Sequence, residues 1–235
     1  YSHFETDLAY LHAACALWPR TFASLLAWKP PWFVHVQPGE EFPRFQKTRK
    51  DFALPGRLLG PFPSGQAADR FIETIQDAFD LCRDYRCLRQ APHGQPCAYG
   101  QMGKCLSPCD GRISMDRYRE MMAQAADFAA GDRQGPLDRL RQEMMQAAGK
   151  LQFERASALK ARLGRLDELN HADYAHLAPL DDFRFVLVQR GAGRRKARAF
   201  LADRGLIQDA GDLDYPLRRP QVDKLLKKMA RLVAR

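Results

Sequence analysis

The sequence lacks any long apolar run. No stretch approaches the roughly 20 apolar residues that a membrane-spanning helix requires, and the longest, at 183–188, is short enough to be a buried strand. We therefore expect a soluble, cytoplasmic protein. The chain begins with Tyr1 rather than Met, so we expect a segment upstream of it.

Three common catalytic motifs are also missing. The sequence contains no G-x-x-x-x-G-K-[ST], no G-x-G-x-x-G and no G-x-S-x-G. These absences remove the usual supports for nucleotide hydrolysis, dinucleotide binding and serine hydrolase chemistry. Internal repeats and low-complexity tracts are absent as well.

The overall composition predicts a folded chain with a basic end. Its 235 residues are 46% hydrophobic and 10% aromatic, enough for one or two real cores. The net charge of +9 comes from residues 184–235, which hold fourteen Lys and Arg against five Asp. A local basic surface attracts polyanions, so nucleic acid is the expected partner, and a solvated basic face is the alternative. The candidate contacts are Arg194, Arg195, Lys196, Arg198, Lys224, Lys227 and Lys228.

Periodicity predicts an α+β protein that is mostly helical. Helices are expected over 4–18, 65–81 with Ser64 as N-cap, 114–131 with Ser114 as N-cap, from Pro136 onward, 151–169 and 220–234. Strands are expected over 32–37 and 42–50, joined as a hairpin by the turn at 38–41, and over 183–189 and 195–202, with 205–210 as a third strand of the last group. A Pro/Gly-rich elbow is expected at 54–65, and two of the later helices should form an antiparallel hairpin. Cys15 is expected in the core.

The cysteines are clustered. Five of the six lie within 28 residues, in a segment with no helical or strand periodicity, so they are expected to share a function. Disulfides suit oxidising compartments and small domains, whereas four thiolates suit tetrahedral zinc or a 4Fe-4S cluster. The spacing C-x7-C-x3-C does not match a zinc knuckle and favours the cluster. The candidate ligands are Cys97, Cys105 and Cys109, with Cys82 or Cys87 as the fourth.

Several motifs in one order carry a resemblance to a known family. The sequence contains FPRF, TRK, LLGPFPSGQAADRFIETIQDAFDL, QPCAYGQMGKCLSPCDG and LQFERASALKARL. Over roughly residues 1–170 this order resembles the bacterial excinuclease subunit UvrC. The resemblance implies a DNA repair protein of the nucleotide excision type with a 4Fe-4S cluster on Cys97, Cys105 and Cys109. Related fused nucleases carry F-x-L-C, which favours Cys82 as the first ligand.

The segment LQFERA resembles the UVR motif. In UvrC proteins this motif is a helical hairpin that docks onto the helicase subunit UvrB. The resemblance implies a partner surface on Leu151, Phe153, Glu154, Ala156 and Leu159. A single hairpin leaves one apolar face half covered, so a second hairpin can complete it, although an ordinary hairpin packed inside its own domain is the alternative.

The sequence also departs from the family. The N-terminal GIY-YIG nuclease motifs would lie upstream of Tyr1, Tyr10 stands where the family has a metal-binding glutamate, and Phe22 stands where it has an asparagine. We therefore identify no catalytic residue in this chain, and any nuclease activity would need upstream residues. The alternative function is a non-catalytic nucleic-acid-binding adaptor with a structural iron-sulfur or zinc centre.

The resemblance and the composition together predict four segments. Residues 1–63 would be the second half of a GIY-YIG-like lobe, 64–131 a cysteine-rich iron-sulfur domain and 132–175 a UVR-type hairpin. Residues 180–235 would be a small basic β/α element that resembles the start of the family's RNase H-like domain.

Overall fold

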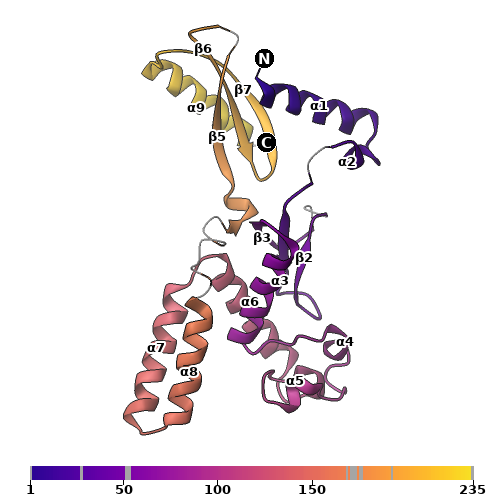
Figure 1. Cartoon of the computed structure of the whole chain (residues 1–235), viewed down its shortest axis with the longest axis vertical. Coiled ribbons are helices and arrows are strands. Elements are labelled where there is room, and N and C mark those ends of the chain that lie inside the picture. Colours follow the sequence, from indigo (N-terminus) through magenta and orange to yellow (C-terminus); the bar gives the residue numbers. More distant parts are fainter. Residues whose placement is uncertain are drawn as a thin grey trace. The chain divides into compact units, whose positions relative to one another are not determined.

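The computed structural model describes residues 2–26, 29–50, 54–167, 169, 174, 177–191 and 193–233. The chain divides into two compact units (Figure 1). Unit 1 comprises residues 1–30 and 180–235, and unit 2 comprises residues 31–179. Helices combined with two antiparallel sheets confirm the α+β class. None of the described helices has both the length and the apolar character needed to cross a membrane.

Unit 2 is built on a four-stranded antiparallel sheet with the order β2-β1-β3-β4. The strands are β1 (Trp32–Val36), β2 (Phe45–Thr48), β3 (Arg57–Phe62) and β4 (Ala178–Pro179). β1 and β2 pair as the sequence predicts, with Val34 opposite Lys47 and Val36 opposite Phe45. Both valines are completely buried, so this hairpin forms part of the core.

The expected elbow at 54–65 is wrong for much of its length, because β3 lies there. Leu59 and Phe62 bury their side chains, and this burial outweighs the poor strand propensity of the glycine and proline between them. Gly60 has a packing role in the strand, since a Cβ at this position would lie 2.5 Å from the ring of Phe33.

Helix α3 (Gly65–Ala78) covers the sheet. The Ser64 hydroxyl accepts a hydrogen bond from the backbone N–H of Ala67 at 3.1 Å, which confirms the predicted N-cap. Phe71 and Ile75 are completely buried on the face that meets the strands. The ring of Phe71 lies 5.1 Å from that of Phe62 on β3, centroid to centroid.

Three longer helices follow the cysteines in unit 2: α6 (Met115–Ala130), α7 (Gln134–Gly149) and α8 (Phe153–Asp167). α6 begins after the predicted cap Ser114 and ends at Gly131, whose φ of 121° favours glycine. α7 begins at Gln134, slightly before the expected Pro136. α7 and α8 lie side by side as a helical hairpin (Figure 1), as expected.

The cysteine-rich segment between α3 and α6 is mostly irregular, as its lack of periodicity predicts. We call residues 82–111 the cysteine loop. It contains three short helices, α4 (Tyr85–Leu88), α5 (Ala98–Gln101) and the 3₁₀ turn η1 (Pro108–Asp110).

Unit 1 contains a three-stranded antiparallel sheet with the order β5-β6-β7. Its elements are α1 (His3–Leu17), α2 (Phe22–Leu25), the 3₁₀ turn η4 (Leu180–Asp182), β5 (Arg184–Arg190), β6 (Lys196–Asp203), β7 (Leu206–Asp214) and α9 (Arg219–Val233). β7 confirms the predicted third strand.

Two sets of contacts hold unit 1 together. Met229 of α9 packs against buried apolar residues of β6 and β7. Phe4 of α1 meets Phe200 of β6 edge to face, with 5.2 Å between ring centroids. Cys15, expected in the core, is only half-buried, and its neighbour Ala14 takes the buried position.

The two units group the chain differently from the four predicted segments. Residues 1–30 cluster with the C-terminal element, whereas the rest of the predicted first segment clusters with the cysteine loop. The predicted segment end at 175 lies outside the described residues.

Candidate metal centre and interaction surfaces

The cysteine loop is anchored to the core at its first residue. After α3, Asp80 adopts a left-handed backbone with φ of 50°, which turns the chain. The backbone N–H of Cys82 donates a hydrogen bond to Tyr118 Oη on α6 at 3.3 Å. The N–H of Leu106 donates to the carbonyl of Asp80 at 3.3 Å. α6 and the far part of the loop therefore fix the position of the first cysteine.

Cys82 and Cys105 are in direct contact. Both are buried, and a hydrogen bond joins their thiols. This hydrogen bond raises the pKa of Cys82 and lowers the pKa of Cys105 to about 7. The backbone N–H of Ser107 also donates to Cys105 Sγ at 3.4 Å. Cys105 is thus predisposed to the thiolate form, in which cysteine binds metals.

Cys109 closes the far end of the loop. It lies in η1 and is 1% exposed, and its carbonyl accepts a hydrogen bond from the N–H of Gly94 at 2.8 Å. Burial raises the pKa of the Cys109 thiol, and Asp110, Cys105 and Cys97 raise it further. Cys97 is half-buried at the start of α5. Cys97, Cys105 and Cys109 therefore interact electrostatically.

Cys87, the alternative fourth ligand, lies in α4 and is half-buried. The Asp84 carboxylate caps this helix by accepting hydrogen bonds from the N–H groups of Arg86 and Cys87. Burial and Asp84 are the main causes that raise the pKa of the Cys87 thiol. Cys97 and Cys109 have smaller effects in the same direction. Cys87 therefore lacks the direct thiol contact that Cys82 makes.

Ser107, between two of the predicted ligands, carries a buried hydroxyl without a partner. The residue is completely buried with a left-handed φ of 49°, and its Oγ makes no hydrogen bond. A Cβ at Gly100 would lie 2.3 Å from this oxygen, so only glycine fits opposite it. A buried polar group in this state calls for an additional partner, such as an ion or water.

The donor chemistry of the loop fits a soft metal centre. All six cysteines of the chain are free, and buried thiols with a nearby orphaned hydroxyl suit thiolate ligation. Among the residues that the structure describes, however, no three His, Cys, Asp or Glu side chains gather closely enough to hold a metal ion.

The turn of the α7–α8 hairpin exposes apolar side chains. Met145, Leu151 and Phe153 are 69%, 71% and 68% exposed. Residues 151–155 line a shallow hollow of about 580 Å³. Of the other predicted partner residues, Glu154 is exposed, whereas Ala156 and Leu159 are half-buried.

One side chain connects this hairpin to the chain just before the cysteine loop. Arg162 of α8 forms an ion pair with Asp80 at 3.7 Å and lies 5.7 Å from the centre of the Phe79 ring. Burial lowers the pKa of Arg162 and raises that of Asp80. The hairpin is therefore packed against the start of the loop at one end and exposed at its turn.

The predicted nucleic-acid contacts fall into two groups. Lys196 pairs with Asp214 at 2.5 Å, and Arg198 pairs with Asp209 at 2.5 Å and with Glu5 at 3.2 Å. These two cations are therefore engaged within unit 1.

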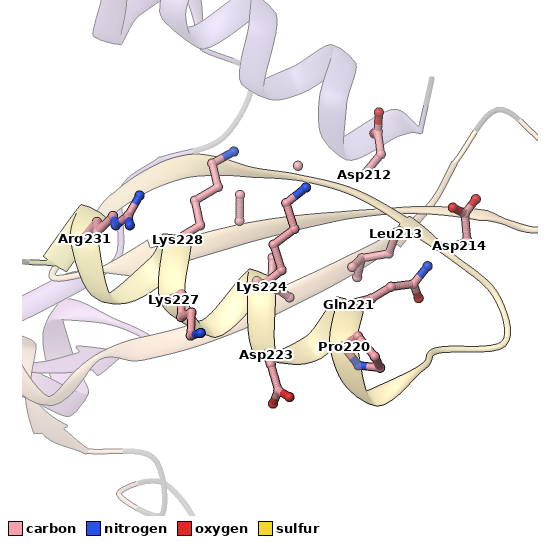
Figure 2. A pocket seen from close by; sticks show the side chains of 13 residues that line it. Asp212, Leu213, Asp214, Pro220, Gln221, Asp223, Lys224, Lys227, Lys228 and Arg231 are labelled. Atoms are coloured by element: carbon pink, nitrogen blue, oxygen red, sulfur yellow. The ribbon is translucent and has the colours of Figure 1, made fainter.

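The other predicted contacts are exposed: Arg194, Arg195, Lys224, Lys227 and Lys228. The three lysines line a hollow between β7 and α9 together with Arg231 (Figure 2), which the sequence prediction omitted. Its position seven residues after Lys224, on the same helix, was the available signal.

Tyr10 and Phe22, the two positions that depart from the expected nuclease motif, lie in the first two helices. The Tyr10 hydroxyl donates a hydrogen bond to the carbonyl of Leu25 at 3.2 Å, which joins α1 to α2. Phe22 is the half-buried first residue of α2. Glu5, a carboxylate of α1, accepts hydrogen bonds from the N–H of Ser2 and from Arg198.

Comparison with known proteins finds similarity to one family. Residues 31–128 match the model of the UvrC/Cho excinuclease middle domain. UvrABC system protein C of Ruminiclostridium cellulolyticum is 32% identical over 154 residues, which is 64% of this chain and 25% of that protein. The proteins of the same name from Nautilia profundicola and Methylococcus capsulatus are 32% and 33% identical over 68% and 57% of this chain.

The chain resembles the UvrC family over its middle region. It spans about a quarter of the length of the curated UvrC relatives that it matches. The whole cysteine loop lies inside the UvrC/Cho middle domain, whereas the α7–α8 hairpin and unit 1 lie outside the matched segment. No solved structure matches the chain significantly.

Proposed function

We propose that this chain is part of a nucleotide excision repair protein that binds DNA and a UvrB-like partner and holds a 4Fe-4S cluster in its cysteine loop. The observation that carries the proposal is the match of residues 31–128 to the UvrC/Cho middle domain, which contains every candidate ligand. We assign no hydrolytic step to these residues.

The cluster would be held by Cys82, Cys97, Cys105 and Cys109. A tetrahedral zinc needs four sulfurs about 2.3 Å from one atom, whereas each iron of a 4Fe-4S cluster takes its own cysteine. The C-x7-C-x3-C spacing of this loop does not match a zinc knuckle, which favours the larger centre. Bound there, a cluster would supply structural cross-links or an electron-accepting centre.

The burial of the two candidates supports Cys82 over Cys87 as the fourth ligand. Cys82 is 6% exposed, contacts the Cys105 thiol and is fixed through its backbone by Tyr118. Cys87 is half-buried and makes no such thiol contact. The Ser107 backbone N–H already donates to Cys105, and its hydroxyl is available for a further hydrogen bond to sulfur.

The hairpin turn is the proposed docking surface for the UvrB-like partner. Leu151 and Phe153 are exposed apolar side chains on a helical hairpin, and a second hairpin could cover them. Glu154 beside them would contribute a charge at the rim of that interface.

Anaerobic purification tests the cluster. We expect a coloured protein with visible absorption and about four iron and four sulfide per chain, the stoichiometry of this cluster type. A colourless protein with one zinc would support the zinc alternative. A colourless, metal-free protein with an ordered loop would overturn the metal proposal.

Two further measurements separate repair nuclease from adaptor. Pull-down with a UvrB protein and DNA binding at increasing salt are expected to be positive in both cases. Incision of damaged duplex with Mg²⁺ by a longer protein that includes upstream residues would support the nuclease. Binding without incision would support the non-catalytic adaptor.

A further inference from the structure

Unit 1 contains a charged groove between its last strand and its last helix. It has a volume of about 870 Å³, and it is lined by residues 210–214 of β7 and by eight residues of α9 between 220 and 231. Figure 2 shows Lys224 and Lys228 projecting to the same side of α9, and Lys227 to the other. We call this feature the β7–α9 groove.

The basic residues of α9 are evenly placed along the groove. Lys224, Lys228 and Arg231 are four and three residues apart, so they lie on one face of the helix. At a rise of about 1.5 Å per residue they span roughly 10 Å. One strand of duplex DNA presents a phosphate about every 3.4 Å along the axis, so roughly three phosphates match this length.

Three cations of the groove, Lys224, Lys228 and Arg231, are exposed and lie outside the ion pairs that the described residues form. Lys228 acts on Asp209 only through its charge, which helps to lower the pKa of that carboxyl. These three helical cations can therefore contact a ligand anion without first breaking an internal salt bridge.

The carboxylates on the opposite wall take part in internal ion pairs. Asp214 pairs with Lys196 at 2.5 Å, and Asp212 lies 3.9 Å from Arg198, which Asp209 shares. Internal pairs thus offset part of the negative charge of β7, whereas Lys224, Lys228 and Arg231 of α9 lie outside the ion pairs of the described residues. The groove is therefore anion-attracting on the helix side.

Gly211 lies in the wall of the groove that β7 forms. Its φ of 113° favours glycine, and a Cβ built there would be in ordinary van der Waals contact with Lys228 Nζ at 3.5 Å. The backbone conformation therefore accounts for this glycine, and it brings β7 beside the Lys228 ammonium.

We propose that the β7–α9 groove binds the phosphate backbone of DNA through Lys224, Lys228 and Arg231. This inference rests on the proposed DNA-binding function and assigns it to one surface. Arg194 and Arg195, at the β5–β6 turn, then lie outside the phosphate contact.

The test is the salt dependence of DNA binding by a triple variant, K224Q/K228Q/R231Q. Fluorescence anisotropy with labelled duplex and single-stranded oligonucleotides gives the slope of log K against log salt concentration. Loss of three phosphate contacts should reduce the magnitude of this slope by about 2.7 for duplex and about 2.1 for single strands. Circular dichroism should show an intact helix, because glutamine is a good helix former.

The matched control is R190Q/R194Q/R195Q, which removes the same charge from the exposed β5–β6 turn of the same unit. We expect its slope to stay near that of the unchanged protein. A reversed result, with the turn variant affected and the groove variant unaffected, would overturn this inference but leave DNA binding in place. No binding by the unchanged chain would overturn the DNA function itself. Equal competition by polyglutamate would show a peptide-type anion site and overturn the assignment to DNA.

Discussion

The two units of the molecule are held together in different ways. Unit 2 has one continuous apolar core that runs from the sheet through α3 and α6 and includes Cys82 and Cys105. Unit 1 has a much smaller core under α9, and its exposed side carries ion pairs and uncompensated cations. The match to the UvrC/Cho middle domain model lies wholly in unit 2. The cysteine loop therefore extends the apolar core of unit 2, whereas unit 1 has a small core and many charged side chains on its surface.

The largest effect that tests this contrast is expected from a substitution in the core of unit 2. Phe71→Ala removes a completely buried ring that contacts Phe62, so we expect a loss of about 3–5 kcal/mol in the free energy of unfolding. Phe185→Ala in unit 1 is the control, because that ring is 48% exposed. Urea unfolding followed by circular dichroism measures both. Equal losses in the two variants would contradict the assignment of the main core to unit 2.

The second prediction concerns the link between core and cysteines. Cys82→Ser should remove the proposed fourth ligand and abolish the visible absorption of the anaerobically purified protein, because serine oxygen is a poor ligand for iron-sulfur centres. Cys87→Ser is the matched control and should retain iron and sulfide.

Cys15→Ser, a change in unit 1, should leave the spectrum unchanged. If Cys87→Ser bleaches the protein and Cys82→Ser does not, the ligand assignment is reversed. If neither does, the loop holds no such cluster on either cysteine.

Much of this fold follows from local sequence signals. Ser64 and Ser114 cap helices as predicted because a hydroxyl directly before an apolar period satisfies the first free N–H groups. β3 escaped prediction because its local composition contradicts its environment. Gly60 lies in a buried strand only because the Phe33 ring occupies the space of a side chain, and that contact is not local in sequence.

The candidate sites were predictable to different extents. The spacing of the cysteines identified the loop, but the contact between Cys82 and Cys105 depends on two other residues. Tyr118 is distant in sequence from Cys82, and no sequence motif marks the turn at Asp80. Composition identified the basic end. It could not show that Lys196 and Arg198 are paired with carboxylates brought close by the register of β6 and β7.

The third prediction sharpens the difference between folding and docking within unit 2. Phe153→Asp should change the free energy of unfolding by less than about 0.5 kcal/mol, because the ring is 68% exposed. It should weaken binding to a UvrB protein by about 2 kcal/mol, roughly thirtyfold, if Phe153 is an interface anchor. Calorimetry or surface plasmon resonance measures the affinity.

Ala158→Asp is the control for this change, since it introduces the same charge at an exposed position of the same helix. Ala158→Asp should leave the free energy of unfolding nearly unchanged, and it should weaken binding to the UvrB protein much less than Phe153→Asp does. Equal weakening by both variants would point to general repulsion instead of a docking surface.

The smallest expected effect tests whether ion pairs matter to unit 1. The hydrogen bond from Arg198 lowers the pKa of Asp209, and that from Arg184 lowers the pKa of Asp203. A carboxyl whose pKa is lower in the folded state stabilises that state above its unfolded pKa of about 3.9, and the stabilisation is lost as the pH falls through the folded value. Unit 1 should therefore lose stability below about pH 4.

Asp209→Asn should remove part of this acid dependence, whereas Asp181→Asn, outside the ion pairs of the described residues, should not. The effect is small because solvent screens both partners of the Arg198 pair, which are 36% and 44% exposed. Urea unfolding at pH 6, 4 and 3 in low salt, followed by a probe in unit 1 such as fluorescence from a label at Cys15, resolves it best. A pH dependence that is identical in the parent protein and in Asp209→Asn would show that unit 1 is held by its small apolar core alone, and the contrast between the two units would then be one of size and not of kind.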